Sequence, residues 1–187
     1  DAGWSGALSV PREIRLDDDH LALRPVPELD ALRGEHVHVG ERSLGPGENP
    51  LADVGGTHLE FDIDIALGSA DAVELVVRAS PDGMERTVIR YADGAVTLDR
   101  RASSLSTATA STPQSIPDVP GSEGDRARLR VLLDASVVEL FVNDRTSLSS
   151  RIYPTRSDST GVAVRARGGT ARLHSLDVWT LESAIRT

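Results

Sequence analysis

The sequence predicts an all-β protein, an antiparallel β-sandwich preceded by a short N-terminal linker segment. Apolar and polar residues alternate with a period of two in many short stretches, and turn signals separate these stretches at regular intervals. The chain has 187 residues, which suits one β domain with an appendage. Hydrophobic residues make up 39% of the chain but aromatic residues only 3%, so Val, Leu, Ile and Ala are expected to build the core.

The first strong strand signal lies at residues 59–65. Its apolar and acidic side chains point to opposite sides: Leu59, Phe61, Ile63 and Ile65 against Glu60, Asp62 and Asp64. The acids are expected to form a polar outer face, in contact with water or paired with Arg126, Arg128 and Arg130 of another strand. The same alternation predicts a strand at residues 73–78, which ends at a turn over 80–83.

A β-hairpin is predicted at residues 87–99. Its two strands flank Asp93-Gly94, a dipeptide that favours a two-residue turn because both of its positions need a positive φ. Four more strands follow, at residues 126–133, 138–142, 162–167 and 173–181, with Gly168-Gly169 turning the chain into the last. Many short strands of this kind favour a sandwich over a βαβ fold.

The remaining segments carry other signals. Residues 27–34 begin with Pro and end with Gly, which predicts one or two helical turns. Residues 42–56 are rich in Gly and Pro and are expected to be a loop, and residues 102–125 read as a long connection. The six aromatic residues are spread one per strand and are expected to fill the core rather than to form a sugar-binding platform.

Composition excludes several functions. The net charge is −9 and no basic block occurs, so neither nucleic acid nor an anionic membrane is an expected partner. No apolar run approaches the ~20 residues of a membrane span, and no secretory signal is present, which leaves the compartment unassigned. The chain contains no Cys, begins at Asp rather than Met, and is expected to be an independent module or a piece of a longer protein.

No metal ion or other cofactor is predicted. His36 and His38 share a strand face, but neither they nor His58 have a third ligand nearby in the sequence. The acidic run at residues 17–20 lacks the central Gly of a calcium loop and is expected to be a solvated turn between strands.

Five segments in order carry a family resemblance: Gly3 to Ile14 (Gly-Trp-Ser-Gly-Ala-Leu-Ser-Val-Pro-Arg-Glu-Ile), Arg24 to Leu29, Val96 to Arg100, Asp134 to Asp144, and Ser149 to Pro154. Together they resemble the C-terminal β-sandwich of glycoside hydrolase family 32, which includes invertases, inulinases and levanases. The resemblance implies a concanavalin- or jelly-roll-like sandwich over residues 34–187. It also implies that residues 1–33 are the end of a catalytic β-propeller and its linker.

In that family, three acidic residues of the propeller carry out catalysis. They lie in a Trp-Met-Asn-Asp-Pro-Asn-like motif, in an Arg-Asp-Pro motif, and beside a Cys, and this chain contains none of these patterns. No catalytic residue is therefore assigned. A retaining glycosidase needs two carboxyl groups ~5–5.5 Å apart, and Glu139 is expected to be an outward or ion-paired carboxylate rather than a proton donor.

The resemblance thus implies a non-catalytic module that stabilises the propeller of an enzyme acting on β-fructofuranosidic bonds in sucrose or fructans. Trp4, Ile14 and Leu16 are the expected docking residues, with Arg12 and Glu13 as polar anchors. Two rival functions remain open: a free-standing fructan-binding module, and a structural domain that forms homo-oligomers.

Overall fold

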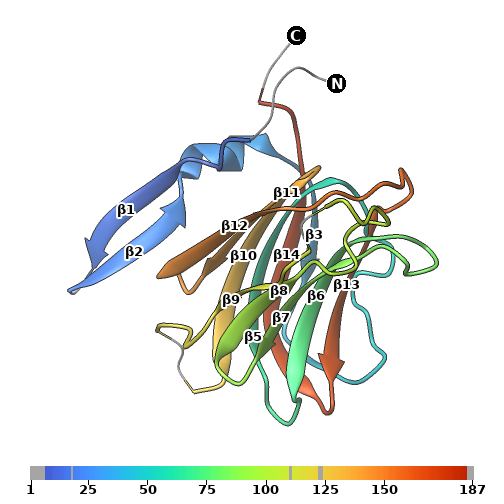
Figure 1. Ribbon diagram of the computed structural model, residues 1–187. Helices are drawn as coiled ribbons and strands as arrows, with labels where there is room; N and C mark the ends of the chain where they lie inside the picture. Colours follow the sequence, from blue (N-terminus) through green and yellow to red (C-terminus); the bar gives the residue numbers. More distant parts are fainter. Residues whose placement is uncertain (1–6, 18, 110, 122–123, 185–187) are drawn as a thin grey trace.

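The computed structural model describes residues 7–17, 19–109, 111–121 and 124–184. Over these ranges the chain forms two antiparallel sheets packed face to face, with a separate two-stranded hairpin beside them (Figure 1). The predicted antiparallel β-sandwich is confirmed. No helix within these ranges is long and apolar enough to cross a membrane.

The larger sheet has seven strands in the order β12-β11-β10-β5-β14-β3, with β4 also paired to β14. Its strands are β3 (Arg33–Val39), β4 (Arg42–Leu44), β5 (His58–Ala66), β10 (Arg126–Asp134), β11 (Val137–Val142), β12 (Thr146–Arg151) and β14 (Ala171–Leu181). Strand β14 is the longest, with 11 residues, so that β3 and β4 can pair with different parts of its length.

The smaller sheet has five strands in the order β13-β6-β7-β8-β9. They are β6 (Ala72–Ala79), β7 (Thr87–Ala92), β8 (Ala95–Asp99), β9 (Gln114–Ile116) and β13 (Gly161–Arg167). The predicted hairpin joins β7 to β8, and its turn residues Asp93 and Gly94 have φ angles of 49° and 69°. The left-handed conformation that this dipeptide favours is thus the one adopted.

The core lies between the two sheets and follows the predicted alternation. Phe61 pairs with Val131 across β5 and β10, and all the apolar residues assigned to the inner face of β5 are buried. From the smaller sheet, Leu75, Ile89 and Tyr91 enter the same core. Most of the other core residues are Val, Leu, Ile and Ala, as the composition requires.

Three local predictions need correction. The expected loop at residues 42–56 contains β4, and the expected connection at 102–125 contains β9; each is three residues long, too short to show an alternation. The aromatic residues do not all fill the core, because Trp179 lies on the outer face of β14 and Tyr153 is 38% exposed. The helical turns are confirmed as a 3₁₀ helix, η1 (Pro27–Leu32).

A buried carboxylate, Glu85, joins three segments at the rim of the smaller sheet. Its oxygens accept hydrogen bonds from the backbone N–H groups of Leu105, Thr155 and Arg156, and from the hydroxyls of Thr155 and Ser159. Burial alone would raise the pKa of Glu85, but the donated hydrogen bonds outweigh it and lower the pKa to about 2. The charged form of Glu85 therefore stabilises the fold.

Glu85→Gln is expected to destabilise the protein at neutral pH, because an amide cannot accept all of these hydrogen bonds. A folded-state pKa of about 2 lies below the ordinary value of 4.5, so the stabilisation is present above pH 4.5 and is lost as the pH falls toward 2. Thermal unfolding of both proteins at several pH values measures this. The gap in melting temperature is expected to narrow over that window, and a gap independent of pH would contradict the assignment.

Candidate functional site

Residues 12–25 form a β-hairpin of β1 (Arg12–Asp17) and β2 (His20–Pro25), which extends beside the sandwich (Figure 1). The acidic run at residues 17–20 makes its turn, as predicted; Asp19 has a φ of 64°, and Asp18 lies outside the described residues. The register places Ile14, Leu16, Leu21 and Leu23 on one face and mostly charged residues on the other. The hairpin is therefore amphipathic.

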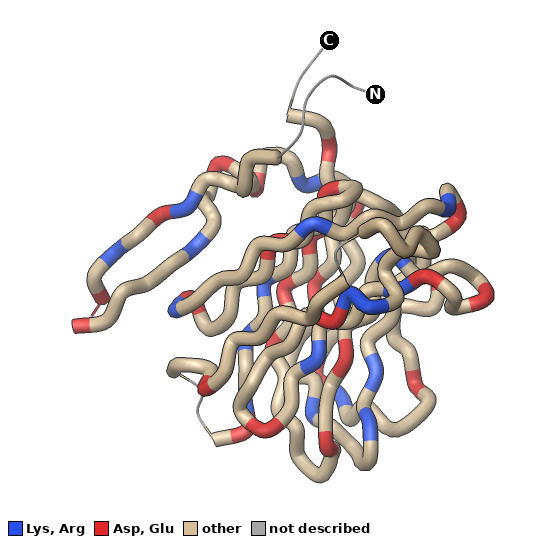
Figure 2. The backbone as a smooth tube through the Cα atoms, in the orientation of Figure 1, with Lys and Arg blue, Asp and Glu red and all other residues tan. Residues whose placement is uncertain are grey.

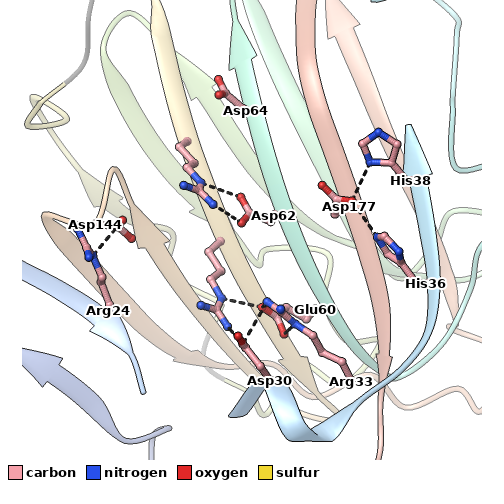
Figure 3. A network of polar contacts seen from close by, with 12 residues as sticks. Arg24, Asp30, Arg33, His36, His38, Glu60, Asp62, Asp64, Asp144 and Asp177 are labelled. Carbon is pink, nitrogen blue, oxygen red and sulfur yellow. Dashed lines mark hydrogen bonds and ion pairs between the residues drawn. The ribbon is translucent and has the colours of Figure 1, made fainter. Parts of the chain in front are cut away.

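The hairpin is held against the turn between β11 and β12. The backbone N–H of Leu23 donates a 2.7 Å hydrogen bond to the carbonyl of Asp144, and the Arg24 guanidinium lies 3.1 Å from the Asp144 carboxylate (Figure 3). Contacts of β2 with both β11 and β12 continue this attachment.

A second anchor joins β1 to the outer face of β11. Arg12 lies 2.8 Å from the carboxylate of Glu139, donates a 2.9 Å hydrogen bond to the Ser147 hydroxyl, and reaches the ring of Phe141 at 5.5 Å. Ser149 also donates to Glu139. Glu139 is thus the ion-paired carboxylate that we expected, but it is buried rather than exposed.

The anchor shows where the sequence prediction was incomplete. Val138, Leu140 and Val142 fill the core as predicted, yet Phe141 on the opposite face of β11 is also buried. The N-terminal segment covers this outer face: residues 7–9 line a small hollow together with Glu139 and Ser149. Alternation along one strand reveals its two faces but cannot reveal which distant segment covers the outer one.

Within the described residues, most of the apolar face of the hairpin is exposed to solvent. Ile14, Leu16 and Leu21 are 65%, 71% and 60% exposed.

An apolar hollow of about 510 Å³ also opens near the two ends of the described chain and is lined in part by Val10, Leu29, Leu32, Leu132 and Leu181. Trp4, the third expected docking residue, lies outside the described residues.

Along β5 and β10, the outer face of the larger sheet is a ladder of ion pairs. Arg126 pairs with Asp64, Arg128 with Asp62 and Arg130 with Glu60, at 2.5–2.6 Å. Each arginine contacts a carboxylate that lies diagonally across the two strands. Arg128, for example, is directly opposite Asp64 in the register but pairs with Asp62, two positions away along β5. Pairing with these arginines was one of the two arrangements that the sequence pattern allowed for the acids of β5. The pairs explain why blue and red segments lie side by side on the neighbouring strands (Figure 2).

The buried carboxylates of the described chain are all engaged in such contacts. Glu60 is paired with Arg33 and Arg130, and Glu139 is paired with Arg12. Glu85 accepts several hydrogen bonds, which lower its pKa. A general acid needs a raised pKa or a neutral carboxyl group. This part of the chain therefore presents structural carboxylates and supports no assignment of a catalytic pair.

The three histidines considered as metal ligands are not brought together. His36 and His38 lie side by side on β3, with Asp177 of β14 between them (Figure 3). His58 lies on β5 and contacts Asp134 at 3.2 Å instead. The expected pairing of His36 and His38 on one strand face is confirmed.

Comparison with known proteins identifies relatives that align with nearly the whole chain. Residues 28–180 match the family model described as glycosyl hydrolases family 32 C terminal. The chain is 30% identical to a sucrose-6-phosphate hydrolase of Zymomonas mobilis and 32% identical to a levanase of Bacillus sp., and covers 36% and 20% of those proteins. These alignments include 97% and 96% of this chain.

A solved exo-inulinase from Aspergillus awamori has the same fold. It superposes with a TM-score of 0.80 at 21% identity, over 98% of this chain and 37% of the inulinase. In each of these relatives, more than half of the protein lies outside the segment that matches this chain.

Arg12→Met is expected to destabilise the protein by about 2–4 kcal/mol, because it leaves the buried Glu139 charge without its cation. Arg15→Met is the matched control, since Arg15 pairs with Glu13 on the exposed surface, and is expected to change stability little. Urea unfolding measures both.

Adding Glu139→Gln to Arg12→Met is expected to recover part of the loss, because the unpaired charge is then removed. Equal effects of Arg12→Met and Arg15→Met would show that the anchor contributes nothing to stability.

Proposed function

The chain belongs to glycosyl hydrolase family 32, as its C-terminal domain, and on this basis we propose that it is the non-catalytic β-sandwich module of a retaining fructosyl glycoside hydrolase. The whole enzyme is proposed to cleave β-fructofuranosidic bonds in sucrose or fructans. The relatives named sucrose-6-phosphate hydrolase and levanase support this substrate class. The engagement of the buried carboxylates in structural contacts supports a module without chemistry of its own.

The proposed role of the module is to stabilise the catalytic domain by packing on it. The observation that carries this proposal is the uncovered apolar row of the hairpin, with Ile14, Leu16 and Leu21 each at least 60% exposed. Covering one such side chain contributes about 1.5–3 kcal/mol. The apolar hollow near both chain ends offers further surface for the same contact.

The proposed interface residues have different tasks. Ile14 and Leu16, with Trp4, would supply the apolar contact, and the partly exposed Glu13 would be a polar anchor to the propeller. Arg12 is held by Glu139, so it would act by fixing the hairpin at the correct position. In this scheme residues 1–33 are the propeller end and linker, and residues 34–187 are the sandwich module.

The two rival functions have less support. A fructan-binding module needs an aromatic platform, but the ring of Trp179 is stacked by His36 at 4.7 Å and contacted by Arg33 at 4.0 Å. Tyr153 is the other partly exposed aromatic residue of the described chain, and Arg151 lies 5.1 Å from its ring. An oligomerisation domain would use the same apolar row to bind a second copy.

The isolated chain of 187 residues is expected to hydrolyse neither sucrose nor levan nor inulin above the uncatalysed rate, and to bind none of them in calorimetry. Release of fructose at a rate typical of enzymes would contradict the proposal. Saturable fructan binding without hydrolysis would favour the carbohydrate-binding module.

Ile14→Asp with Leu16→Asp is expected to leave the isolated chain folded, because both side chains already face solvent. In a polypeptide that carries this chain behind a propeller, the same pair is expected to lower the melting temperature of the propeller by several degrees. Leu105→Ser, at a 49% exposed position remote in sequence, is the control; it keeps the backbone N–H that donates to Glu85, adds no charge beside it, and should have little effect. Self-association of the isolated chain in sedimentation, abolished by the Ile14 and Leu16 changes, would instead favour the oligomerisation domain.

A further inference from the structure

Three potential metal ligands converge on the outer face of β3, the edge strand of the larger sheet. His36 and His38 are two residues apart on β3 and therefore point to the same side. The register places His38 directly opposite Asp177 of β14. One carboxylate oxygen of Asp177 lies 2.8 Å from Nε2 of His36 and 2.8 Å from Nδ1 of His38 (Figure 3).

The orientation of these groups is fixed by their neighbours. Trp179 lies directly opposite His36, and the two rings stack with centroids 4.7 Å apart and planes 4° apart. The guanidinium of Arg33 packs on the same tryptophan. The imidazole of His36 is thereby held with Nε2 toward Asp177, so that little side-chain entropy remains to be lost when a ligand binds.

The charge around Asp177 is also unusual for this sheet. The acids of β5 on the same face are each paired with arginine, including Asp62, which lies directly opposite Asp177. Within the described residues, the ion-pair partners of Asp177 are the two histidines. Asp177 therefore differs from these acids in that imidazole nitrogens, which can bind a metal ion, lie where the other acids have a guanidinium.

We propose that His36, His38 and Asp177 bind a divalent first-row transition ion, with Zn²⁺ as the best fit. Imidazole nitrogen and carboxylate oxygen are ligands that Zn²⁺ prefers, at about 2.0–2.2 Å. The three ligand atoms lie within 4.8 Å of one another, so small rotations of the side chains bring them to one ion. His36 and His38 are 44% and 55% exposed, which leaves an open path to the site and room for water as a further ligand.

A bound ion would replace two hydrogen bonds by three coordination bonds between β3 and β14. Among the strands of the described ranges, β14 is the one neighbour of β3. The ion would therefore clamp an edge of the larger sheet to its interior. This role is independent of sugar hydrolysis and of the docking function of the hairpin.

The test is calorimetric titration of the 187-residue chain, stripped with a chelator, with zinc chloride in a non-coordinating buffer. One saturable site is expected. Loss of a second-shell group typically weakens metal binding about 10–100-fold, so His38→Ala and Asp177→Asn, which remove ligands, are expected to weaken it by at least about 100-fold. Mg²⁺ is expected not to compete, because it prefers oxygen ligands.

His58→Ala is the matched control. His58 is also about half exposed and also contacts a carboxylate, that of Asp134, but it has no second histidine beside it. Binding of Zn²⁺ by this variant is expected to equal that of the unchanged protein.

Two further measurements keep the result decisive. Zn²⁺ is expected to raise the melting temperature of the unchanged protein and of His58→Ala, but not of His38→Ala, whose exposed side chain can be removed without loss of the fold. In nuclear magnetic resonance spectra, Zn²⁺ is expected to shift the imidazole signals of His36 and His38 only. Absence of a saturable site, or equal binding after His38→Ala, would overturn the proposal and leave a hydrogen-bonded cluster.

Discussion

The alternation of side chains along β5, β10 and β11 is the constraint on which the rest of this structure depends. It commits one row of each strand to the core between the sheets, where Phe61, Val131 and Leu140 are buried. The side chains of the opposite row lie on the outer face of the larger sheet. Because neighbouring strands are hydrogen-bonded to each other, these outer side chains lie close together and must find partners among themselves or in another segment.

The outer face of the larger sheet is satisfied in three different ways. Along β5 and β10, arginines neutralise carboxylates diagonally, as in the pair of Arg128 with Asp62. Over β11, the N-terminal segment covers Phe141 and places Arg12 against Glu139. At β3, two histidines rather than arginines contact Asp177, and these three side chains form the metal-binding set that we propose.

These arrangements fit the non-catalytic role that we propose for this glycosyl hydrolase domain. Glu85 accepts several hydrogen bonds, which lower its pKa, so it is poorly suited to donate a proton. Glu60 and Glu139 are held in ion pairs with arginine. The exposed apolar surface lies on one face of the hairpin and in the hollow near the ends of the described chain. A domain of this kind is suited to packing against a larger partner.

The sequence by itself determined the fold class, the inner and outer rows of the main strands, the turn at Asp93-Gly94 and the family, because these depend on local periodicity, turn chemistry and ordered motifs. It did not reveal β4 or β9, since three residues carry too little pattern. Only the tertiary structure decided that Glu139 is buried under Arg12, and that Asp177 joins His36 and His38 from a strand about 140 residues away. Such contacts depend on the register and order of strands, and these are set by the packing of the whole sandwich rather than by any one segment.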